Sequence, residues 1–318
     1  MTKSEHITLG LAQLAPVWLD RAGTMEKILK TIQSAGKQGC DLVAFGEALL
    51  PGYPFWVENT QGAKFNSPLQ KEIHAHCMQE AVQISAGDLG AVCSAAADNH
   101  LAVVLGCIER AEDRGGHSLY ASLVYINAKG QIESVHRKVM PTYEERLTWA
   151  QGDGHGLQVH SLGAFTVGGL NCWENWMPLM RSALYGLGED LHIAIWPGNL
   201  RNTVNLTRFI AEESRSFVAS VSGLMRREDI SPKVPHAQMI AESSPEVMAD
   251  GGTCLAGPDG AWIIEPKVGS EGLFIAQIDQ QRVREERQNF DPSGHYSRPD
   301  VVQLTVNRTR QNVLKIID

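Results

Sequence analysis

Two patterns of apolar residues alternate along this chain, and each predicts a different secondary structure. Runs such as LAVVLGCIER at 101–110 are apolar at nearly every position, which is typical of strands buried on both faces. Between residues 20 and 36, apolar side chains instead recur every three or four positions, which predicts a helix. By the same criteria, strands are predicted at 7–14, 42–45, 118–127, 132–140, 163–173, 190–198, 218–225 and 273–279, a hairpin at 251–266, and helices at 71–86, 88–99, 177–187, 206–217 and 280–288.

The alternation of these strands with helices predicts an α/β protein. No internal stretch has the composition of a linker, so one large domain over residues 1–290 is predicted. After about Asp291 the segment DPSGHYSRPD begins a tail rich in Arg, Asn and Pro. Residues 291–318 are therefore predicted to form a C-terminal extension, which we expect at a subunit interface.

Composition narrows the range of partners. The 318 residues carry 28 basic and 36 acidic side chains, a net charge of −8, which argues against nucleic acid or an anionic membrane as a partner. No run of about 18 apolar residues predicts a membrane-spanning helix, and the N-terminus lacks the features of a secretory signal. A cytoplasmic location is therefore predicted, where the six scattered cysteines are expected to be reduced. Without a Cys-x-x-Cys pair, neither a thioredoxin-like redox site nor a zinc ribbon is expected.

Reactive side chains follow three of the predicted strands. Glu47 comes after the strand at 42–45, Lys138 follows IESVHR, and Cys172 follows FTVGGLN. Functional groups gather at the carboxyl ends of strands in α/β sheets, so these three would converge if their strands are neighbours. Taken singly, a cysteine there is usually a packing residue, and a Glu or Lys is usually a solvated loop residue. Spacing alone leaves their meeting a hypothesis.

The trio has a coherent chemistry. A free thiol has a pKa of about 8.5, so a carboxylate that takes its proton would act as general base while sulfur attacks an electrophilic carbon bonded to nitrogen. A lysine would stabilise the negative charge that develops. This chemistry needs no metal or organic cofactor. Other candidate sites are weaker: no Gly-x-Ser-x-Gly is present, GDGHG at 152–156 fits a loop, and HAHC at 74–77 fits an exposed helix face better than a zinc site.

Several longer blocks of sequence resemble the nitrilase branch of the carbon–nitrogen hydrolase superfamily. They are FGEALLPGYPFW, HRKVMPTYEERLTWAQGDG, GGLNCWENWMPLMRSALYGLGEDLHIAIWPG and the tail motif DPSGHYSRPDVVQL, in the family's order over nearly the whole chain. The resemblance implies a four-layer α-β-β-α sandwich. It also implies that Glu47 is the general base, Lys138 the lysine and Cys172 the nucleophile, with Glu145 holding Lys138.

The resemblance extends to residues around the nucleophile. It implies that the backbone N–H of Trp173 stabilises developing negative charge together with Lys138. Tyr53, Trp173 and Trp196 are predicted substrate contacts, and Glu174 is predicted to hold the turn. CWEN resembles the nitrile-hydrolysing branch more than the aliphatic amidases. Many nitrilases carry a histidine where this chain has Tyr143-Glu144, which puts the substrate preference in doubt.

The function implied is that of a nitrilase, which converts an organic nitrile to a carboxylic acid and ammonia through a thioimidate and a thioester on Cys172. An amidase, or a nitrile or cyanide hydratase on the same scaffold, is the alternative. A non-catalytic binding or scaffold protein is the alternative of another class. The resemblance further implies a homodimer or a larger homo-oligomer such as a spiral.

Overall fold

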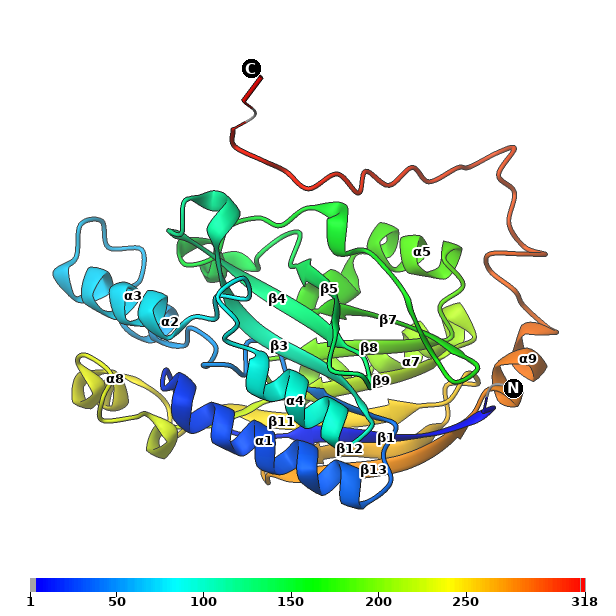
Figure 1. Ribbon diagram of the computed structural model, residues 1–318, viewed down its shortest axis with the longest axis horizontal. Helices are drawn as coiled ribbons and strands as arrows, with labels where there is room; N and C mark the ends of the chain where they lie inside the picture. The colour runs from blue at the N-terminus through cyan, green and yellow to red at the C-terminus, as the bar shows by residue number, and fades with distance from the viewer. Residues whose placement is uncertain (1–3, 315, 318) are drawn as a thin grey trace.

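The computed structural model describes residues 4–314 and 316–317, and two β-sheets lie face to face at its centre (Figure 1). The first sheet is six-stranded, in the order β13-β1-β2-β3-β4-β5. Its strands are β1 (His6–Gln13), β2 (Leu42–Phe45), β3 (Ala102–Ala111), β4 (Ser118–Ile126), β5 (Ile132–Arg137) and β13 (Gly272–Asp279).

The second sheet is seven-stranded, with the path β10-β11-β9-β8-β7-β6 and with β12 paired to β11. Strands β7, β8 and β9 run parallel to one another, so their carboxyl ends point the same way. The strands are β6 (His160–Leu162), β7 (Phe165–Asn171), β8 (Leu191–Trp196), β9 (Phe217–Ser222), β10 (Leu224–Arg226), β11 (Val247–Ala256) and β12 (Trp262–Val268).

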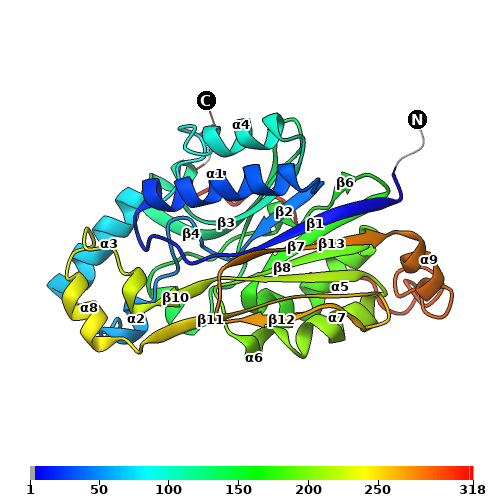
Figure 2. The same cartoon turned by 90° about the horizontal axis from the view of Figure 1, so that it is seen from below.

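Helices cover the outer face of each sheet, which completes four layers. In Figure 2, α1 (Arg21–Lys37) and α4 (Gly90–Asp98) lie on one side of the sheets, and α5 (Pro178–Gly186), α6 (Leu200–Thr203) and α7 (Leu206–Ser214) lie on the other. The remaining helices are α2 (Trp56–Asn59), α3 (Pro68–Glu80), α8 (Ala237–Ser243) and α9 (Gln281–Arg287). The predicted α-β-β-α sandwich is confirmed.

The alternation of side chains along the strands builds this arrangement, because successive residues of a strand point to opposite faces. On β8, Leu191, Ile193 and Ile195 belong to the core between the sheets, whereas Ala194 and Trp196 pack with α7 in the outer layer. The strands are therefore buried on both faces, which explains their nearly continuous apolar sequences.

Several predicted boundaries were wrong by a few residues. Helix α3 ends at Glu80 rather than Ala86, because Val82 pairs with Glu109 in an isolated β-bridge. Strand β5 ends at Arg137 and β7 at Asn171, so Lys138 and Cys172 lie just beyond their strands. Short elements such as β6, α2, α6 and α8 were not predicted.

The segment after α9 has no helix or strand among its described residues and runs back along the molecule as an extended chain, coloured orange to red in Figure 1. Asp153 holds this segment against the body of the molecule. Its carboxylate accepts from Arg310 at 3.0 Å and from the backbone N–H of Gln311 at 3.0 Å. A domain boundary at residue 290 stays a prediction. Among the described residues, no helix combines the length and apolar character needed to cross a membrane.

Candidate active site

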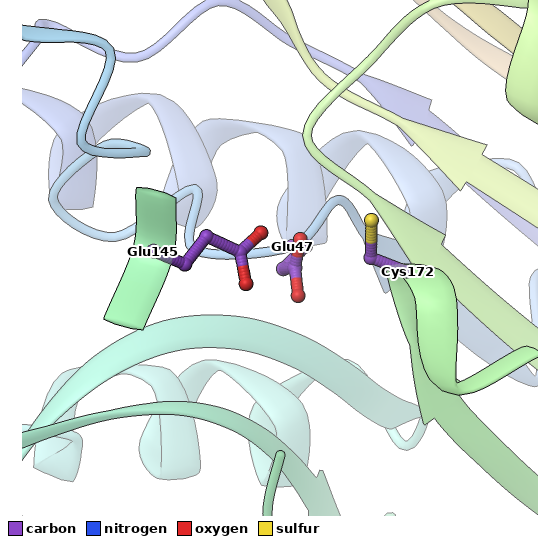
Figure 3. A group of neighbouring side chains, drawn as sticks. All are labelled: Glu47, Glu145 and Cys172. Atoms are coloured by element: carbon purple, nitrogen blue, oxygen red, sulfur yellow. The ribbon is translucent and has the colours of Figure 1, made fainter. Parts of the chain in front are cut away.

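The residues that follow β2, β5 and β7 converge on one small volume. Nζ of Lys138 lies 2.9 Å from Oε1 of Glu47 and 2.7 Å from Oε2 of Glu145. Figure 3 shows the Glu47 carboxylate between Glu145 and the sulfur of Cys172, and ligand atoms of these three residues lie within 4.8 Å of one another. All four side chains are buried. The structure therefore brings together the four residues that the sequence analysis selected for catalysis.

Two glycines allow Glu47 to reach this position. A Cβ on Gly106 of β3 would collide with the carbonyl of Gly46 and lie 2.7 Å from Cα of Glu47. A Cβ on Gly46 would lie 2.9 Å from the carbonyl oxygen of Trp196. That same carbonyl accepts a hydrogen bond from the N–H of Glu47 at 3.1 Å, which joins the end of β2 to the end of β8 across the two sheets.

Cys172 occupies a strained backbone conformation at the start of a 3₁₀ turn, η4 (Cys172–Trp176). Its φ of 45° lies in the left-handed region, where a residue with a side chain costs roughly 1–2 kcal/mol. The backbone N–H of Trp173 acts to lower the pKa of the Cys172 thiol, as a donor close to the sulfur does. The sequence resemblance selected this N–H, and a donor at that position can stabilise charge that develops next to the sulfur.

Glu174 fixes the ends of two strands at once. Its carboxylate accepts from the N–H of Val139 at 2.7 Å and from the N–H of Asn171 at 3.0 Å. It also lies 3.0 Å from Nε2 of His136. Burial raises the pKa of Glu174, but His136 and the two backbone donors outweigh it and hold that pKa below its ordinary value. Because Val139 follows Lys138 and Asn171 precedes Cys172, Glu174 sets the separation of those two functional residues, as predicted for a residue that holds the turn.

Glu145 has a full set of hydrogen-bond partners. Its Oε2 accepts from Lys138 and from the N–H of Thr142 at 2.6 Å, and its Oε1 accepts from the hydroxyl of Tyr53 at 2.8 Å. Burial raises the pKa of Tyr53 well above its usual value, so the hydroxyl remains a donor. Lys138 also lies 5.7 Å from the ring centroid of Trp149, a distance at which a cation is attracted to an aromatic face.

The Glu47 carboxylate contrasts with that of Glu145. Lys138 is close enough for an ion pair, but neither oxygen of the Glu47 carboxylate has a well-formed hydrogen bond among the described residues. Burial raises the pKa of Glu47 to about 8; Lys138 opposes this rise, and Glu145 adds to it. A buried carboxylate with free lone pairs and a pKa near neutrality is suited to accept a proton.

The other two groups of the trio are held in complementary states. Burial raises the pKa of the Cys172 thiol well above its usual value, and Glu47 adds to the rise, while Lys138 and the N–H of Trp173 act against it. Burial alone would lower the pKa of Lys138, but Glu47, Cys172 and Glu145 hold it well above its usual value. A neutral thiol therefore lies beside a permanent ammonium, and transfer of the thiol proton must accompany attack by sulfur.

The spacing of the Glu47, Glu145 and Cys172 ligand atoms is also one that a metal ion could use. The ammonium of Lys138 pairs with both carboxylates, at 2.9 and 2.7 Å. The Lys138 ammonium thus occupies the place at which a metal ion would bind the carboxylates of Glu47 and Glu145.

Cys172 and Glu145 line a pocket of about 300 Å³. Cys172 lies in its lining with Tyr53 and Trp173, two of the three residues that the sequence analysis proposed as substrate contacts. Tyr143 and Glu144, the pair at which the family resemblance led us to expect a histidine, also line it, and burial raises the pKa of Glu144. The other lining residues are Phe55, Glu58, Thr142, Pro197, Gly198, Asn199, Arg201, Asn202, Met248 and Ala249.

Trp196, the third residue proposed as a substrate contact, does not line this pocket. Its side chain is fully buried in the outer layer, where Nε1 donates to Ser220 at 3.1 Å. The reason is the alternation of β8, which points Trp196 away from the inner core. Trp196 contacts the site through its backbone carbonyl instead, which anchors Glu47. Trp173 points its side chain toward solvent and is 51% exposed, so its ring does not pack beneath the site.

A family model described as carbon–nitrogen hydrolase matches residues 8–288, a span that includes all four buried residues of the site. The chain belongs to the carbon–nitrogen hydrolase family. Among curated relatives, a "Nitrilase 2" from an unknown prokaryotic organism is 34% identical, over 96% of this chain and 94% of the relative. An aliphatic nitrilase from Rhodococcus rhodochrous is 32% identical, over 93% and 81%, and an arylacetonitrilase from Aspergillus kawachii is 31% identical, over 95% and 92%.

Solved structures support the fold. A carbon–nitrogen hydrolase from Helicobacter pylori G27 superposes with a TM-score of 0.70 at 18% identity, over 93% of this chain and 96% of that chain. An amidase from Nesterenkonia sp. AN1 gives a TM-score of 0.64 at 17% identity, over 89% and 97%. At identities below 20%, these two structures support the α-β-β-α sandwich fold of this chain and nothing about its substrate.

Sequence reasoning missed a buried polar cluster behind the nucleophile. Glu189, His192 and Asn175 are each 0% exposed and linked by hydrogen bonds, with His192 on β8 and Asn175 in η4. A signal was present in the sequence, because His192 interrupts the apolar strand LHIAIW with a polar side chain that must find partners.

Proposed function

We propose that this chain is a nitrilase, which hydrolyses an organic nitrile to the carboxylic acid and ammonia. The observation that supports this most is the convergence of Cys172, Lys138, Glu47 and Glu145 at a pocket, in a family member whose relatives over nearly its whole length are nitrilases. The same arrangement contains the parts that nucleophilic catalysis at a carbon–nitrogen bond requires.

In the first step, Glu47 takes the proton of the Cys172 thiol as sulfur attacks the nitrile carbon. One C–N π bond breaks, and the nitrogen receives a proton from the acid that Glu47 has become, which gives a neutral thioimidate. Lys138 and the N–H of Trp173 stabilise the negative charge that develops on nitrogen. The pKa of Glu47 near 8 lets one carboxyl group accept and return a proton in the same cycle.

In the second step, water adds to the thioimidate carbon, and Glu47 removes a proton from that water. Protonation of the nitrogen allows ammonia to leave, and a thioester remains on Cys172. A second water then opens the thioester, which releases the carboxylic acid and returns the thiol. Glu145, which bonds both Lys138 and Tyr53, holds the ammonium in place throughout.

The decisive experiment is a panel of aliphatic, aromatic and arylaceto nitriles together with the matching amides. Ammonia release and the mass of the product are measured for each compound. Acid and ammonia from at least one nitrile are expected. Accumulation of amide from every nitrile would assign a hydratase, and turnover of amides alone would assign an amidase.

Two variants attribute this activity to the site. Cys172→Ala should abolish ammonia release, and Cys93→Ala should retain it, because Cys93 is a half-buried thiol on α4 far along the chain from the strand ends. Full activity in Cys172→Ala would remove the nucleophile from the proposal. Absence of turnover for the whole panel would favour a binding or scaffold protein.

We also propose that the chain works as a homo-oligomer in the cytoplasm. Apolar side chains are exposed on the outer layer at Leu179 of α5 and Phe209 of α7, and the guanidinium of Arg181 lies over the Phe209 ring. Light scattering should report a dimer or larger assembly, and Leu179→Glu should reduce it. Deletion of residues 291–318 tests whether the tail contributes, and cell fractionation tests the location.

A further inference from the structure

A chain of hydrogen bonds runs from a buried carboxylate to the backbone of the nucleophile. The Glu189 carboxylate lies 2.9 and 3.0 Å from Nδ1 of His192, and Nε2 of His192 lies 2.7 Å from Oδ1 of Asn175. Nδ2 of Asn175 donates to the carbonyl of Cys172 at 2.8 Å and to that of Leu170 at 3.3 Å. None of the three side chains has measurable exposure.

The partners fix the orientation of the Asn175 amide. Two carbonyl oxygens, of Leu170 and Cys172, can only accept, so the side of the amide that faces them must be the NH₂ group. The Oδ1 atom consequently faces His192. Rotation of the amide by half a turn would place its oxygen against the Cys172 carbonyl and its NH₂ against the N–H of His192.

The same logic fixes a hydrogen on His192. Because Oδ1 of Asn175 can only accept, Nε2 must carry a hydrogen. The Glu189 carboxylate holds the other ring nitrogen, Nδ1, at 2.9 and 3.0 Å. Glu189 therefore fixes the position of the His192 ring, and the Nε2–H of His192 fixes the orientation of Asn175.

The fold makes room for this cluster in a specific way. A Cβ on Gly168 of β7 would collide with the Glu189 carboxylate. Gly168 leaves the space that lets the carboxylate lie beside His192 on the neighbouring strand β8.

The bond to the Cys172 carbonyl matters because that carbonyl and the N–H of Trp173 belong to one rigid peptide unit, in which they point in opposite directions. A donor that holds the carbonyl on one side thereby directs the N–H on the other, toward the thiol. It also polarises the peptide and strengthens that N–H as a donor. Because φ of Cys172 is 45°, the turn by itself would relax from this position.

We propose that Glu189, His192 and Asn175 form a positioning relay that aims and polarises the Trp173 N–H at the charge formed during catalysis. This inference rests on the proposed function, since it assigns the stabilising donor of that reaction. The three are positioning residues, because they act through the peptide and do not touch the substrate.

The test compares two replacements of one residue. In His192→Gln the side-chain amide can still donate to Asn175, whereas in His192→Phe the volume is kept and the donor is lost. Asn175→Asp, which removes the donor to the Cys172 carbonyl, is a second breaking variant should His192→Phe fail to fold. Tyr185→Phe, which removes a hydrogen bond to Glu213 in the same layer, controls for general destabilisation.

Two rates are measured for each variant. The first is kcat for the best nitrile of the panel. The second is the rate at which iodoacetamide alkylates Cys172. Alkylation uses the same sulfur and the same base but places no negative charge at the nitrile nitrogen. The ratio of the two rates therefore isolates the stabilising donor from the position of the thiol.

The relay predicts that this ratio falls about 10- to 100-fold in His192→Phe and Asn175→Asp, with KM changed by less than about 3-fold. His192→Gln should recover most of the loss, and Tyr185→Phe should match the wild type. Equal losses in His192→Gln and His192→Phe, or an unchanged ratio in the breaking variants, would overturn the relay. Failure of the proposed function would show in the wild-type protein, whereas failure of the relay shows only in the variants.

Discussion

Two glutamates of the site have the same chemistry but different surroundings. Glu145 accepts from Lys138, Tyr53 and the N–H of Thr142, so its lone pairs are occupied. The Glu47 carboxylate has one ion-pair contact and no well-formed hydrogen bond among the described residues. The first environment suits a residue that holds an ammonium, and the second suits a residue that exchanges protons.

The pH dependence of catalysis should report Glu47. With a pKa of about 8, it is mostly protonated at pH 6 and becomes able to act as a base as the pH rises. We expect kcat/KM to increase up to about pH 8 and then level off, since kcat/KM reports the free enzyme. A profile of kcat/KM from pH 5.5 to 9.5 checks this, and a flat profile would assign the base elsewhere.

The stability of the protein should depend on the same proton. The pKa of Glu47 is about 8 in the folded state against 4.5 ordinarily, so the folded state binds more protons between these values. The free energy of unfolding should therefore fall as the pH rises from about 4.5 to 8, and Glu47→Gln should remove that part of the fall. Urea titrations of both proteins at pH 5 and pH 9 measure it.

An equal decrease from pH 5 to pH 9 in the wild type and in Glu47→Gln would contradict this prediction. Glu47→Asp serves as the control, because it retains a buried carboxyl group and hence a pH dependence of the same sign.

At the scale of single residues, the sequence predicted the reactive residues better than the buried polar residues that hold them in position. Glu47, Lys138 and Cys172 were found because they follow predicted strands, where functional groups gather in α/β sheets, and because they match a family motif. Trp196 does not line the pocket, and the alternation of β8 with its apolar inner positions indicates its outward side chain, so its contact with substrate stays a prediction. His192 and Glu189 escaped notice because their contact depends on a space left by Gly168 on another strand.

At the scale of the elements, the site depends on how closely β2 and β3 approach. Gly106 of β3 faces the backbone of Gly46 and Glu47 so closely that no side chain fits. The segment after β2 could not turn toward Lys138 over a larger residue. The position of Glu47 is therefore set by a residue about sixty positions away in the chain.

Gly106→Ala should therefore displace Glu47 and lower kcat by about 100-fold or more, because misplacement of a catalytic group by about 1 Å costs this much. Gly186→Ala is the matched control. A Cβ on Gly186 meets nothing within 4 Å, and the residue ends helix α5, so the variant should keep full activity. Steady-state kinetics of both variants check the prediction, and an active Gly106→Ala would refute it.

Element boundaries show which local signals suffice. Helix α3 begins at Pro68, directly after the capping residue Ser67. The apolar pattern alone predicted a start three residues later, because it did not use this capping signal. The end of the helix was predicted too far along because Ala81 and Val82 continue the apolar pattern. A β-bridge to Glu109 ends the helix there, and this long-range contact has no local signature.

At the scale of the whole molecule, the tail is held by few contacts. Asp153 accepts from Arg310 and from the N–H of Gln311, and it also caps the short turn η3 (Gly154–Gly156). Most other residues of the segment are exposed. The tail is therefore expected to dock and undock as a unit that depends on one carboxylate.

Asp153→Asn should weaken this docking and expose the chain around Arg308 and Arg310. We expect trypsin to cleave there several-fold faster in the variant than in the wild type, while the rest of the protein resists cleavage. Mass spectrometry of a digestion time course identifies the sites. Asp300→Asn is the control, because Asp300 pairs only with Arg298 at the surface. Equal cleavage rates at Arg308 and Arg310 in all three proteins would contradict the role of Asp153.

The sandwich itself followed from family resemblance and not from the apolar pattern. The pattern predicted strands and helices, and it also predicted the hairpin that β11 and β12 form, but nothing local indicates that β1 pairs with β13 or that β9 pairs with β11. Such pairings join residues far apart in sequence, so their stability lies in the finished core and not in any single segment.

The pairing of β1 with β13 has a consequence for biosynthesis. Every residue from His6 to Gln13 is paired with one from Asp279 back to Gly272. The first strand to be synthesised therefore lacks this pairing partner until nearly the whole chain has been made. A ribosome must release nearly the entire polypeptide before that edge is covered. Until then the nascent chain offers an open template to other molecules, and chaperone capacity during translation, rather than the durability of the finished enzyme, is expected to limit its yield in a heterologous host.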